Sequence, residues 1–397
     1  MWVSLARLGR LKFLQYSPIL YNLGAVIALL EGAQFQFSTW ALGLAFVWVV
    51  HAGTHYCNEY YDLPADRLNR DPSPWTGGSR VLVNGDLDAK ISIQIARVAF
   101  GVATALALAL PLGCCQALAA LIVVLSWGYS APPLRLAWRG LGESTVVVVL
   151  NLSVPLLGCG LLLGTLPLQL WTVLLPLAPI SFTRMLIMNM ADVESDRAAG
   201  KRTLVVILGM ARSTAVHRLG LAAAYLMLPA AVALGLPLDA ALCLLVGSGP
   251  LALWIIRRIT HWQPWTFDLP WVASIHNALA TILLFAALWA RLPSSTGTGL
   301  LILLLLPILG VIAGTLRGLL GSRHGARALP PLLGGIAAAM LLLFFIRIYG
   351  WFDPADTGNR DDDTSHSVKL TDRSERPPLR RYQHVSLCEP THRHAQG

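Results

Sequence analysis

Charged residues are scarce in this sequence. Asp, Glu, Lys and Arg make up 13% of the 397 residues, whereas soluble domains carry roughly 25%. Hydrophobic residues make up 55%, and the mean hydropathy is +0.60. This balance excludes an ordinary soluble domain. It predicts an all-α integral membrane protein with several spans.

Cysteines are also few. The six cysteines show no metal-ligand spacing, and five of them lie in or beside apolar stretches, where cysteine usually behaves as a small apolar residue. A disulfide framework is therefore not expected. The N-terminus lacks a small-residue cleavage site after a short apolar stretch, so we expect no signal peptide.

What the sequence has instead is long apolar runs. A bilayer-spanning helix needs about 20 apolar residues, and the candidate spans are 17–34, 38–57, 91–111, 114–130, 144–163, 168–188, 214–234, 237–256, 271–290, 298–316 and 331–350. We expect a short N-terminal segment (1–15), a nine-helix core (16–292) and two additional C-terminal helices (293–350). The last segment (351–397) is polar and is expected to be a disordered tail.

Lys and Arg alternate between the loops. Arg7, Arg10 and Lys12 precede the first span, and basic residues return after every second span. The loops without Lys or Arg are 31–37, 111–114, 164–169 and 235–239. This positive-inside pattern predicts a cytoplasmic N-terminus in a lipid bilayer, most simply a bacterial inner membrane. The net charge of +9 then reflects topology, and no nucleic acid partner is expected.

Two pairs of aspartates lie at the ends of apolar stretches. Asp62 and Asp66 form the first pair, and Asp192 and Asp196 form the second. The i, i+4 spacing puts both carboxylates of a pair on one helix face, and Asn58 lies one turn before Asp62. Carboxylates beside lipid are costly unless a metal, a counter-charge or water accepts them. By the predicted topology both pairs face the cytoplasm.

Two such faces brought together would form a pocket for Mg²⁺ and a phosphorylated ligand. Mg²⁺ prefers a few carboxylates, retained waters and phosphate oxygens, and it can act as a Lewis acid on a departing diphosphate. The alternative is that these acids only belong to solvated helix ends. Because a proline inside a helix removes a backbone hydrogen bond, Pro64 predicts that the helix bends or ends near Asp62.

Basic residues near the aspartates are candidates for substrate binding. Arg184 lies inside an apolar stretch, eight residues before Asp192, and is expected to bind substrate, with pairing to a structural acid as the alternative. Lys201 would contact phosphate as a point charge. Arg80, which follows a pair of glycines, carries the same expectation.

His51 and His55 lie on the face that leads to Asn58, one and two turns deeper in the membrane. A zinc site would need further ligands, and the sequence does not identify any. The functional interpretation is that His55 orients or deprotonates a phenolic acceptor. The alternative is packing, with hydrogen bonds to neighbouring helices.

These motifs resemble those of the UbiA superfamily of intramembrane prenyltransferases. The matching residues are Asn58, Asp62 and Asp66; Asp192, Asp196, Gly200 and Thr203; and the loop 129–136, which begins with Tyr129. The resemblance covers residues 15–292. It implies Mg²⁺-dependent ionisation of a polyprenyl diphosphate and transfer to a small acceptor, usually aromatic. It also implies that the four aspartates and Tyr129 are catalytic.

The chain departs from the family at one position of the loop. Many members carry Lys four residues after the loop tyrosine, where this sequence has Pro133. We therefore expect Arg135 or Arg139 to supply the cation.

The acceptor stays open because the branch signals conflict. Segments 140–143 and 77–82 resemble the menaquinone branch, which prenylates 1,4-dihydroxy-2-naphthoate, whereas segment 129–133 resembles chlorophyll synthase and homogentisate transferases. Two other functions also stay open. One is a transporter of an anionic or lipid-diphosphate ligand, and the other is a relative that ionises a prenyl diphosphate without using an acceptor.

Overall fold

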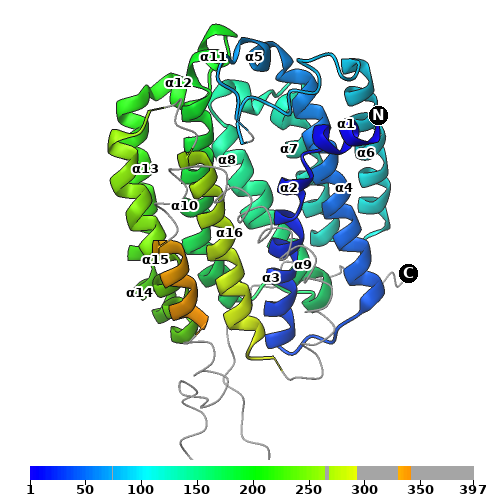
Figure 1. Cartoon of the computed structure of the whole chain (residues 1–397). Helices are drawn as coiled ribbons and strands as arrows, with labels where there is room; N and C mark the ends of the chain where they lie inside the picture. The colour runs from blue at the N-terminus through cyan, green and yellow to red at the C-terminus, as the bar shows by residue number, and fades with distance from the viewer. Residues whose placement is uncertain (74, 264–267, 293–329, 341–397) are drawn as a thin grey trace, which may run out of the picture.

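The computed structural model describes residues 1–73, 75–263, 268–292 and 330–340, and every regular element in these ranges is a helix (Figure 1). In chain order the elements are α1 (Trp2–Leu8), α2 (Leu11–Leu14), α3 (Tyr16–Leu30), α4 (Phe37–Tyr61), α5 (Leu63–Leu68), α6 (Ala89–Ala109), α7 (Cys114–Ser130), η1 (Leu136–Arg139), α8 (Gly142–Val146), the π-helix η2 (Val147–Ser153), α9 (Val154–Leu163), α10 (Leu168–Ala191), α11 (Val193–Ala198), α12 (Leu204–Leu208), α13 (Met210–Leu226), α14 (Leu228–Ala233), α15 (Leu238–Arg258), η3 (Ile259–His261) and α16 (Asp268–Trp289).

Eight helical segments in the described ranges are long and apolar enough to cross a membrane. They are Leu11–Leu30, Phe37–Tyr61, Ala89–Ala109, Gly142–Leu163, Leu168–Ala191, Met210–Ala233, Leu238–His261 and Leu269–Trp289. Helix α7 is a shorter apolar helix that matches the expected span 114–130. Each segment overlaps an apolar stretch predicted from the sequence, so the all-α membrane fold is confirmed. The first segment starts six residues earlier than expected, at Leu11.

The expected spans 298–316 and 331–350 and the expected tail 351–397 lie largely outside the described residues. Within this region a helix is described over Pro330–Met340, drawn in orange beside α15 in Figure 1. Its Gly335 lies against the backbone of Gly247 in α15, where even a methyl group would not fit. The two helices therefore pack backbone to backbone.

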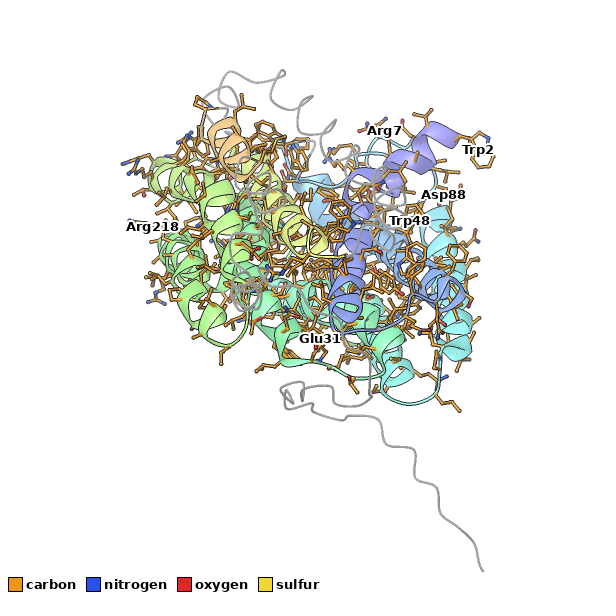
Figure 2. The ribbon with its side chains drawn as sticks, turned by 90° about the horizontal axis from the view of Figure 1, so that it is seen from below. Trp2, Arg7, Glu31, Trp48, Asp88 and Arg218 are labelled. Carbon is orange, nitrogen blue, oxygen red and sulfur yellow. The ribbon has the colours of Figure 1, made fainter. Side chains whose placement is uncertain are left out.

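The outer surface of the bundle carries large apolar side chains, and polar side chains are buried inside it. Leu108, Leu219 and Leu226 are 69%, 72% and 78% exposed, whereas Asn22 and Thr281 are buried. Seen from below, the helices surround an interior filled with side chains, and the charged Arg218 lies on the periphery (Figure 2). An apolar exterior with a polar interior is the pattern expected of helices that face lipid.

Both aspartate pairs lie at the same end of the bundle. Helices α5 and α11 are in contact at the top of Figure 1, and α12 lies beside them. Each pair follows a break in a long helix. Asp62 lies between α4 and α5, and Asp192 lies between α10 and α11. Pro64 lies in the first turn of α5, where its missing N–H needs no partner, so the helix ends near Asp62 as expected.

Candidate active site

A cavity of about 270 Å³ lies inside the bundle below this end. Its polar end is lined by Asn58, Asp62, Asp66, Asp192, Asp196 and Lys201. Much of the rest is lined by apolar and aromatic side chains, among them Phe13, Tyr16, Val50, Ile122, Leu125, Tyr129, Val149, Met188 and Ile275, and polar side chains such as His51, His55 and Arg184 also line it. The cavity thus joins a charged end to a largely apolar chamber, and Val149 comes from the π-helix η2, an element that is frequent at functional sites.

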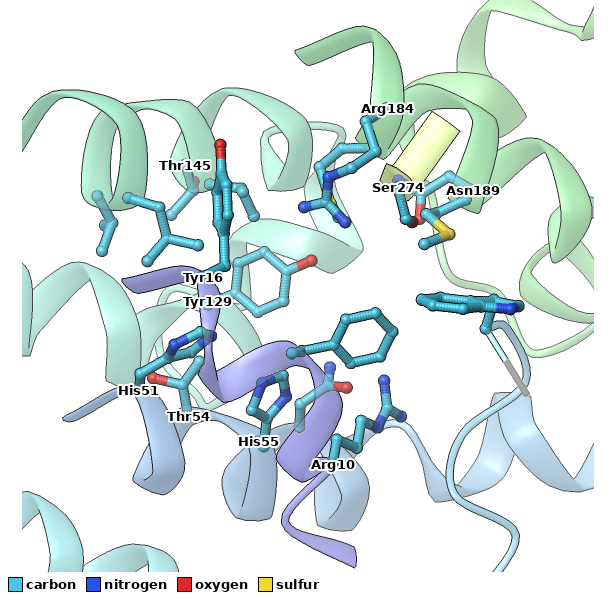
Figure 3. A pocket seen from close by; sticks show the side chains of 18 of the residues that line it. Arg10, Tyr16, His51, Thr54, His55, Tyr129, Thr145, Arg184, Asn189 and Ser274 are labelled. Atoms are coloured by element: carbon cyan, nitrogen blue, oxygen red, sulfur yellow. The ribbon is translucent and has the colours of Figure 1, made fainter. Parts of the chain in front are cut away.

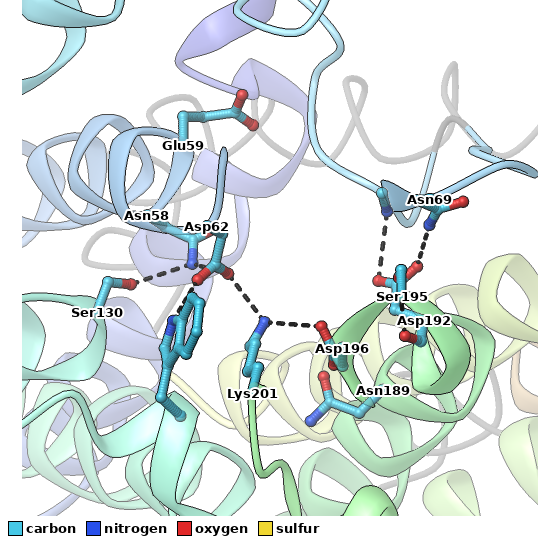
Figure 4. A network of polar contacts seen from close by, with 12 residues as sticks. Asn58, Glu59, Asp62, Asn69, Ser130, Asn189, Asp192, Ser195, Asp196 and Lys201 are labelled. Carbon is cyan, nitrogen blue, oxygen red and sulfur yellow. Dashed lines mark hydrogen bonds and ion pairs between the residues drawn. The ribbon is translucent and has the colours of Figure 1, made fainter. Parts of the chain in front are cut away.

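Lys201 connects the two aspartate pairs (Figure 4). Its Nζ lies 3.0 Å from Asp62 Oδ2 and 3.3 Å from Asp196 Oδ1. Asp62 also accepts hydrogen bonds from Asn58 Nδ2, at 2.7 Å, and from Trp138 Nε1, at 2.8 Å. Removing one partner of a buried ion pair leaves an uncompensated charge, which costs about 3–5 kcal/mol. Lys201 therefore holds the polar end together.

The turn after α11 explains how Lys201 reaches this place. Gly200 adopts a left-handed conformation (φ +76°), the N–H of Lys201 donates to Asp196 O at 2.8 Å, and the N–H of Gly200 donates to Arg197 O at 3.1 Å. These two bonds form a Schellman motif, which favours glycine at this position. Thr203 then caps α12 through a bond from Val206 N. Thus the glycine and the threonine that follow the second pair shape the turn that carries Lys201.

Asp192 is bound by the loop that follows the first pair. Asn69 Nδ2 donates to Asp192 Oδ1 at 2.8 Å, and the N–H of Gly77 donates to Asp192 Oδ2 at 3.3 Å. Figure 4 shows these contacts on the far side of Asp196 from Lys201. The loop therefore joins the two halves of the bundle across the polar end.

Arg10 and Glu59 fasten the N-terminal segment to α4. Arg10 Nε lies 2.6 Å from Glu59 Oε1, and the same carboxylate accepts hydrogen bonds from Ser79 N and Ser79 Oγ, at 2.8 and 2.6 Å. Glu59 is buried, and these donors satisfy its carboxylate. Arg10 lines the cavity and adds a second cation to its polar end.

The carboxylates at the polar end outnumber these two cations. Burial raises the pKa of Asp66 to about 8 and that of Asp192 to about 7, with the neighbouring carboxylates adding to the effect. Burial also acts on Asp62, but there Lys201, Trp138 and Asn58 outweigh it and lower the pKa. Burial would lower the pKa of Lys201, but Asp62 and Asp196 raise it well above its ordinary value. This is a site that would gain from a bound cation.

The donor set fits Mg²⁺. All candidate ligands are hard oxygens, and Asp196 Oδ2 is buried without a hydrogen-bond partner among the described residues. Within those residues, no three His, Cys, Asp or Glu side chains converge closely enough to hold a metal alone. This agrees with Mg²⁺, which usually binds through one or two carboxylates and takes its other ligands from water and phosphate.

We predict that Mg²⁺ stabilises the protein more at high than at low pH. The pKa values of Asp66 and Asp192 are raised from the ordinary 3.8 to about 8 and about 7. At pH values between the ordinary and the raised pKa, these carboxyl groups hold protons in the folded, metal-free protein but have lost them in the unfolded chain. The stability of the protein therefore falls as pH rises through about 8, and Mg²⁺ replaces the protons. Thermal unfolding in detergent, with Mg²⁺ or with chelator, at about pH 6 and about pH 8 measures this. An equal shift at both pH values would contradict it.

Gly78 leaves space for Asp66. It has φ +75°, and a Cβ at this position would collide with the Asp66 carboxylate. We predict that Gly78→Ala displaces Asp66 and lowers turnover at least tenfold. The left-handed backbone also destabilises the variant by about 1–2 kcal/mol, because alanine has a Cβ atom. Gly85→Ala is the matched control, because Gly85 has φ +77° and nothing within 4 Å of the added methyl. Equal turnover of the two variants would refute the role of Gly78.

The structure brings most of the predicted site residues to the cavity. Its lining includes Asn58, Asp62, Asp66, Asp192, Asp196, Tyr129, Arg184, Lys201 and His55. Figure 3 shows Tyr129, Arg184 and His55 around one open space.

Arg80, Arg135 and Arg139 do not line this cavity. Arg80 donates through Nη1 to the backbone oxygen of Asp66, Arg135 stacks on the Trp138 ring at 4.0 Å, and Arg139 is exposed. Arg80 and Arg135 thus support groups that contact the aspartates.

Three contributors to the polar end were not predicted from the sequence: Arg10, Asn69 and Trp138. Arg10 fits the positive-inside pattern, and tryptophans near span ends resemble interface anchors. The contacts of Trp138 with Asp62 and of Asn69 with Asp192 join residues 76 and 123 positions apart. Such pairings leave no local signal in one sequence.

Comparisons with known proteins agree with this architecture. The chain is 32% identical over 201 residues to the digeranylgeranylglyceryl phosphate synthase of Halobacterium salinarum, a match that spans 49% of this chain and 65% of that relative. It superposes on a UbiA homologue from Archaeoglobus fulgidus, solved bound to GPP and Mg²⁺, with a TM-score of 0.54 and 17% identity over 71% of this chain and 98% of the other.

An apo UbiA homologue from Aeropyrum pernix K1 gives the same TM-score, 0.54, with 20% identity over 69% of this chain and 96% of the other. At these identities the two structures establish the fold. The UbiA prenyltransferase family pattern matches residues 19–271, which is more than half of the sequence. This chain therefore belongs to the UbiA prenyltransferase family.

Proposed function

We propose that this chain catalyses the Mg²⁺-dependent transfer of a polyprenyl group from an allylic diphosphate to a small aromatic quinone precursor. One observation carries the proposal. Two aspartate pairs bridged by Lys201 form the polar end of a cavity whose remaining walls are largely apolar and aromatic. The polar end suits a diphosphate group. The largely apolar chamber suits a hydrocarbon chain and leaves little room for water.

The chemistry of each side chain sets its role in the proposed reaction. Aspartates of the two pairs would hold the metal together with water and diphosphate oxygens, and Lys201 and Arg10 would bind the diphosphate oxygens. When bound, Mg²⁺ supplies Lewis-acid stabilisation of the negative charge on diphosphate. The C1–O bond of the prenyl diphosphate breaks, and the electron pair leaves with diphosphate. C1 then bonds to the acceptor, which releases one proton. The rings of Phe13 and Tyr129 face the space where the cationic C1 would form.

Two classes of acceptor are candidates, and different observations support each of them. The resemblance of segments 77–82 and 140–143 to the menaquinone branch favours 1,4-dihydroxy-2-naphthoate. The relative from H. salinarum is named for a glycerophosphate lipid, which makes a prenylated glycerophosphate the second candidate. The aromatic lining of the cavity supports the first class, because aromatic rings pack well on one another.

The side of the membrane belongs to the same proposal. At the end opposite the aspartates, the loops 31–36, 110–113, 164–167 and 234–237 contain no Lys or Arg, and Arg291, the basic residue described there after α16, pairs with Asp239; the loops around α5 and α11 are basic. By the positive-inside rule, this charge pattern supports a candidate active site on the cytoplasmic face, and the membrane that we propose is a bacterial inner membrane.

Product analysis tests the proposal. The purified protein is incubated with Mg²⁺, geranylgeranyl diphosphate and, in separate reactions, a hydroxynaphthoate, a hydroxybenzoate, homogentisate or a prenylated glycerophosphate. A prenylated aromatic product with stoichiometric diphosphate supports it. Diphosphate release that gives only a terpene hydrocarbon or alcohol would favour the acceptor-free enzyme. No release with any acceptor, together with substrate uptake into vesicles, would favour a transporter.

A further inference from the structure

The short helix α1 lies close to the membrane boundary. Figure 1 shows it running across the bundle near the end that carries the aspartates, whereas the long helices run along the bundle. Two residues separate its end at Leu8 from Leu11, where the first membrane span begins. Since this stretch of chain reaches at most about 11 Å, α1 stays at the membrane surface.

The outward face of α1 carries exposed apolar side chains. Trp2 is 78% exposed and Val3 is 73% exposed, and Figure 2 shows Trp2 at the periphery, pointing away from the bundle. Arg7 lies one turn after Val3 on the same side, and 52% of its side chain is exposed. Tryptophan and arginine on one face of a helix that lies across the spans are typical of a helix in the membrane interface.

The inward face of α1 does not explain why this helix is stable. Leu8 is the one buried residue of α1, and it joins Val81 and Leu82 in a small cluster that is separate from the main core. The hydroxyl of Tyr56 also donates to Leu5 O at 3.0 Å. Isolated helices shorter than about 12 residues are marginal in water, so this seven-residue helix needs further contacts. A lipid surface against the outward face would supply them.

The segment 77–86 lies between α1 and the aspartates. Asp86 Oδ2, at one end of the segment, lies 3.7 Å from Arg7 Nη1. At the other end, the N–H of Gly77 donates to Asp192 Oδ2 at 3.3 Å. The small apolar cluster with Leu8 lies between these two contacts in the sequence. A movement of α1 would therefore reach the loop that binds Asp192.

We propose that α1 is a lipid-binding helix whose outward face docks on the bilayer surface and thereby holds the segment 77–86 against the aspartates. Trp2 and Val3 enter the boundary between the headgroups and the acyl chains, and Arg7 stays at the level of the lipid phosphates. The partner is the lipid surface itself. This interaction lies outside the candidate active site and uses no substrate.

Fluorescence quenching tests the contact with lipid. The full chain is placed in phosphatidylcholine nanodiscs whose acyl chains are either ordinary or brominated near the headgroup. Because bromine quenches tryptophans that enter the lipid, we expect a larger quenched fraction in the wild type than in Trp2→Phe. An unchanged or larger quenched fraction in the variant would place Trp2 in water and overturn the proposal.

Hydrogen exchange tests the link to the aspartates. It is followed in nanodiscs for the segment 77–86, where the N–H groups of Asn84 and Asp86 bond to backbone oxygens of the same segment. Trp2→Ser should raise the exchange rates there about tenfold, because α1 loses its lipid contact, and Trp2→Phe should keep the wild-type rates. Trp48→Ser is the matched control, since Trp48 is a 45% exposed tryptophan of α4 and should leave this segment unchanged.

Two outcomes of the exchange experiment would overturn the proposal. One is unchanged exchange of the segment 77–86 in Trp2→Ser. The other is an equal rise in Trp2→Ser and Trp48→Ser, or a rise over the whole chain, because either would mean a general loss of stability. Neither measurement uses a prenyl diphosphate or an acceptor, so a failure here is distinguished from a failure of the proposed reaction.

Discussion

Replacing Asp62 and Asp192 together with alanine should lower Mg²⁺-dependent diphosphate release by ~1,000-fold or more. One aspartate comes from each pair, so the variant removes carboxylates from both sides of the polar end. The ion then loses ligands from both helix breaks, and negative charge on the departing diphosphate loses several kcal/mol of stabilisation. The measurement is the rate of diphosphate release from geranylgeranyl diphosphate in detergent.

A matched control removes the same charge from the same end of the molecule. Asp71 and Glu194 are both exposed, do not line the cavity and lie close in sequence to the two pairs. The variant Asp71→Ala, Glu194→Ala should keep turnover within about twofold of the wild type, as surface changes usually do. A similar loss of activity in both double variants would mean that surface charge, and not the cavity carboxylates, sets the rate.

Lys201→Met should give the second large effect. The variant leaves Asp62 and Asp196 as buried carboxylates without their shared cation, which costs about 3–5 kcal/mol in the metal-free protein. Turnover should fall by about 100-fold, because a cation aimed at the diphosphate is lost. Mg²⁺ should raise the melting temperature of the variant more than that of the wild type, since the ion supplies the missing positive charge.

Lys90→Met is the control for this change, because Lys90 is exposed and does not line the cavity. Melting is followed with chelator and with Mg²⁺ for the wild type and both variants. An unchanged melting temperature of Lys201→Met in chelator would show that the bridge between the aspartates contributes nothing to the fold.

Residue spacing within one helix was enough to predict much of the candidate site. Pro64 predicted the helix break near Asp62, since a proline acts locally on the backbone. The membrane spans could also be predicted from the sequence, because a helix that crosses a bilayer needs a long apolar run. The start of the first span was less well predicted, because Lys12 lies in α2 and Gln15 lies between α2 and α3.

Contacts between distant segments could not be predicted. The bond from Trp138 to Asp62 depends on how the loop after α7 folds over the end of α4. Arg135 illustrates the same point. The family resemblance implied a cation from this loop, but the chain stacks Arg135 on Trp138 and puts Arg10, from the N-terminal segment, at the cavity. Packing decides which cation lines the cavity, and residue spacing within one loop does not encode it.

Metal-dependent substrate binding tests the central claim most directly. A non-hydrolysable geranylgeranyl thiodiphosphate is titrated against the wild type and the Asp62→Ala, Asp192→Ala variant, each with Mg²⁺ and with chelator. We expect saturable binding only to the wild type with Mg²⁺. Equal binding with Mg²⁺ and with chelator, or retained binding by the variant, would contradict a metal–diphosphate site at the paired aspartates.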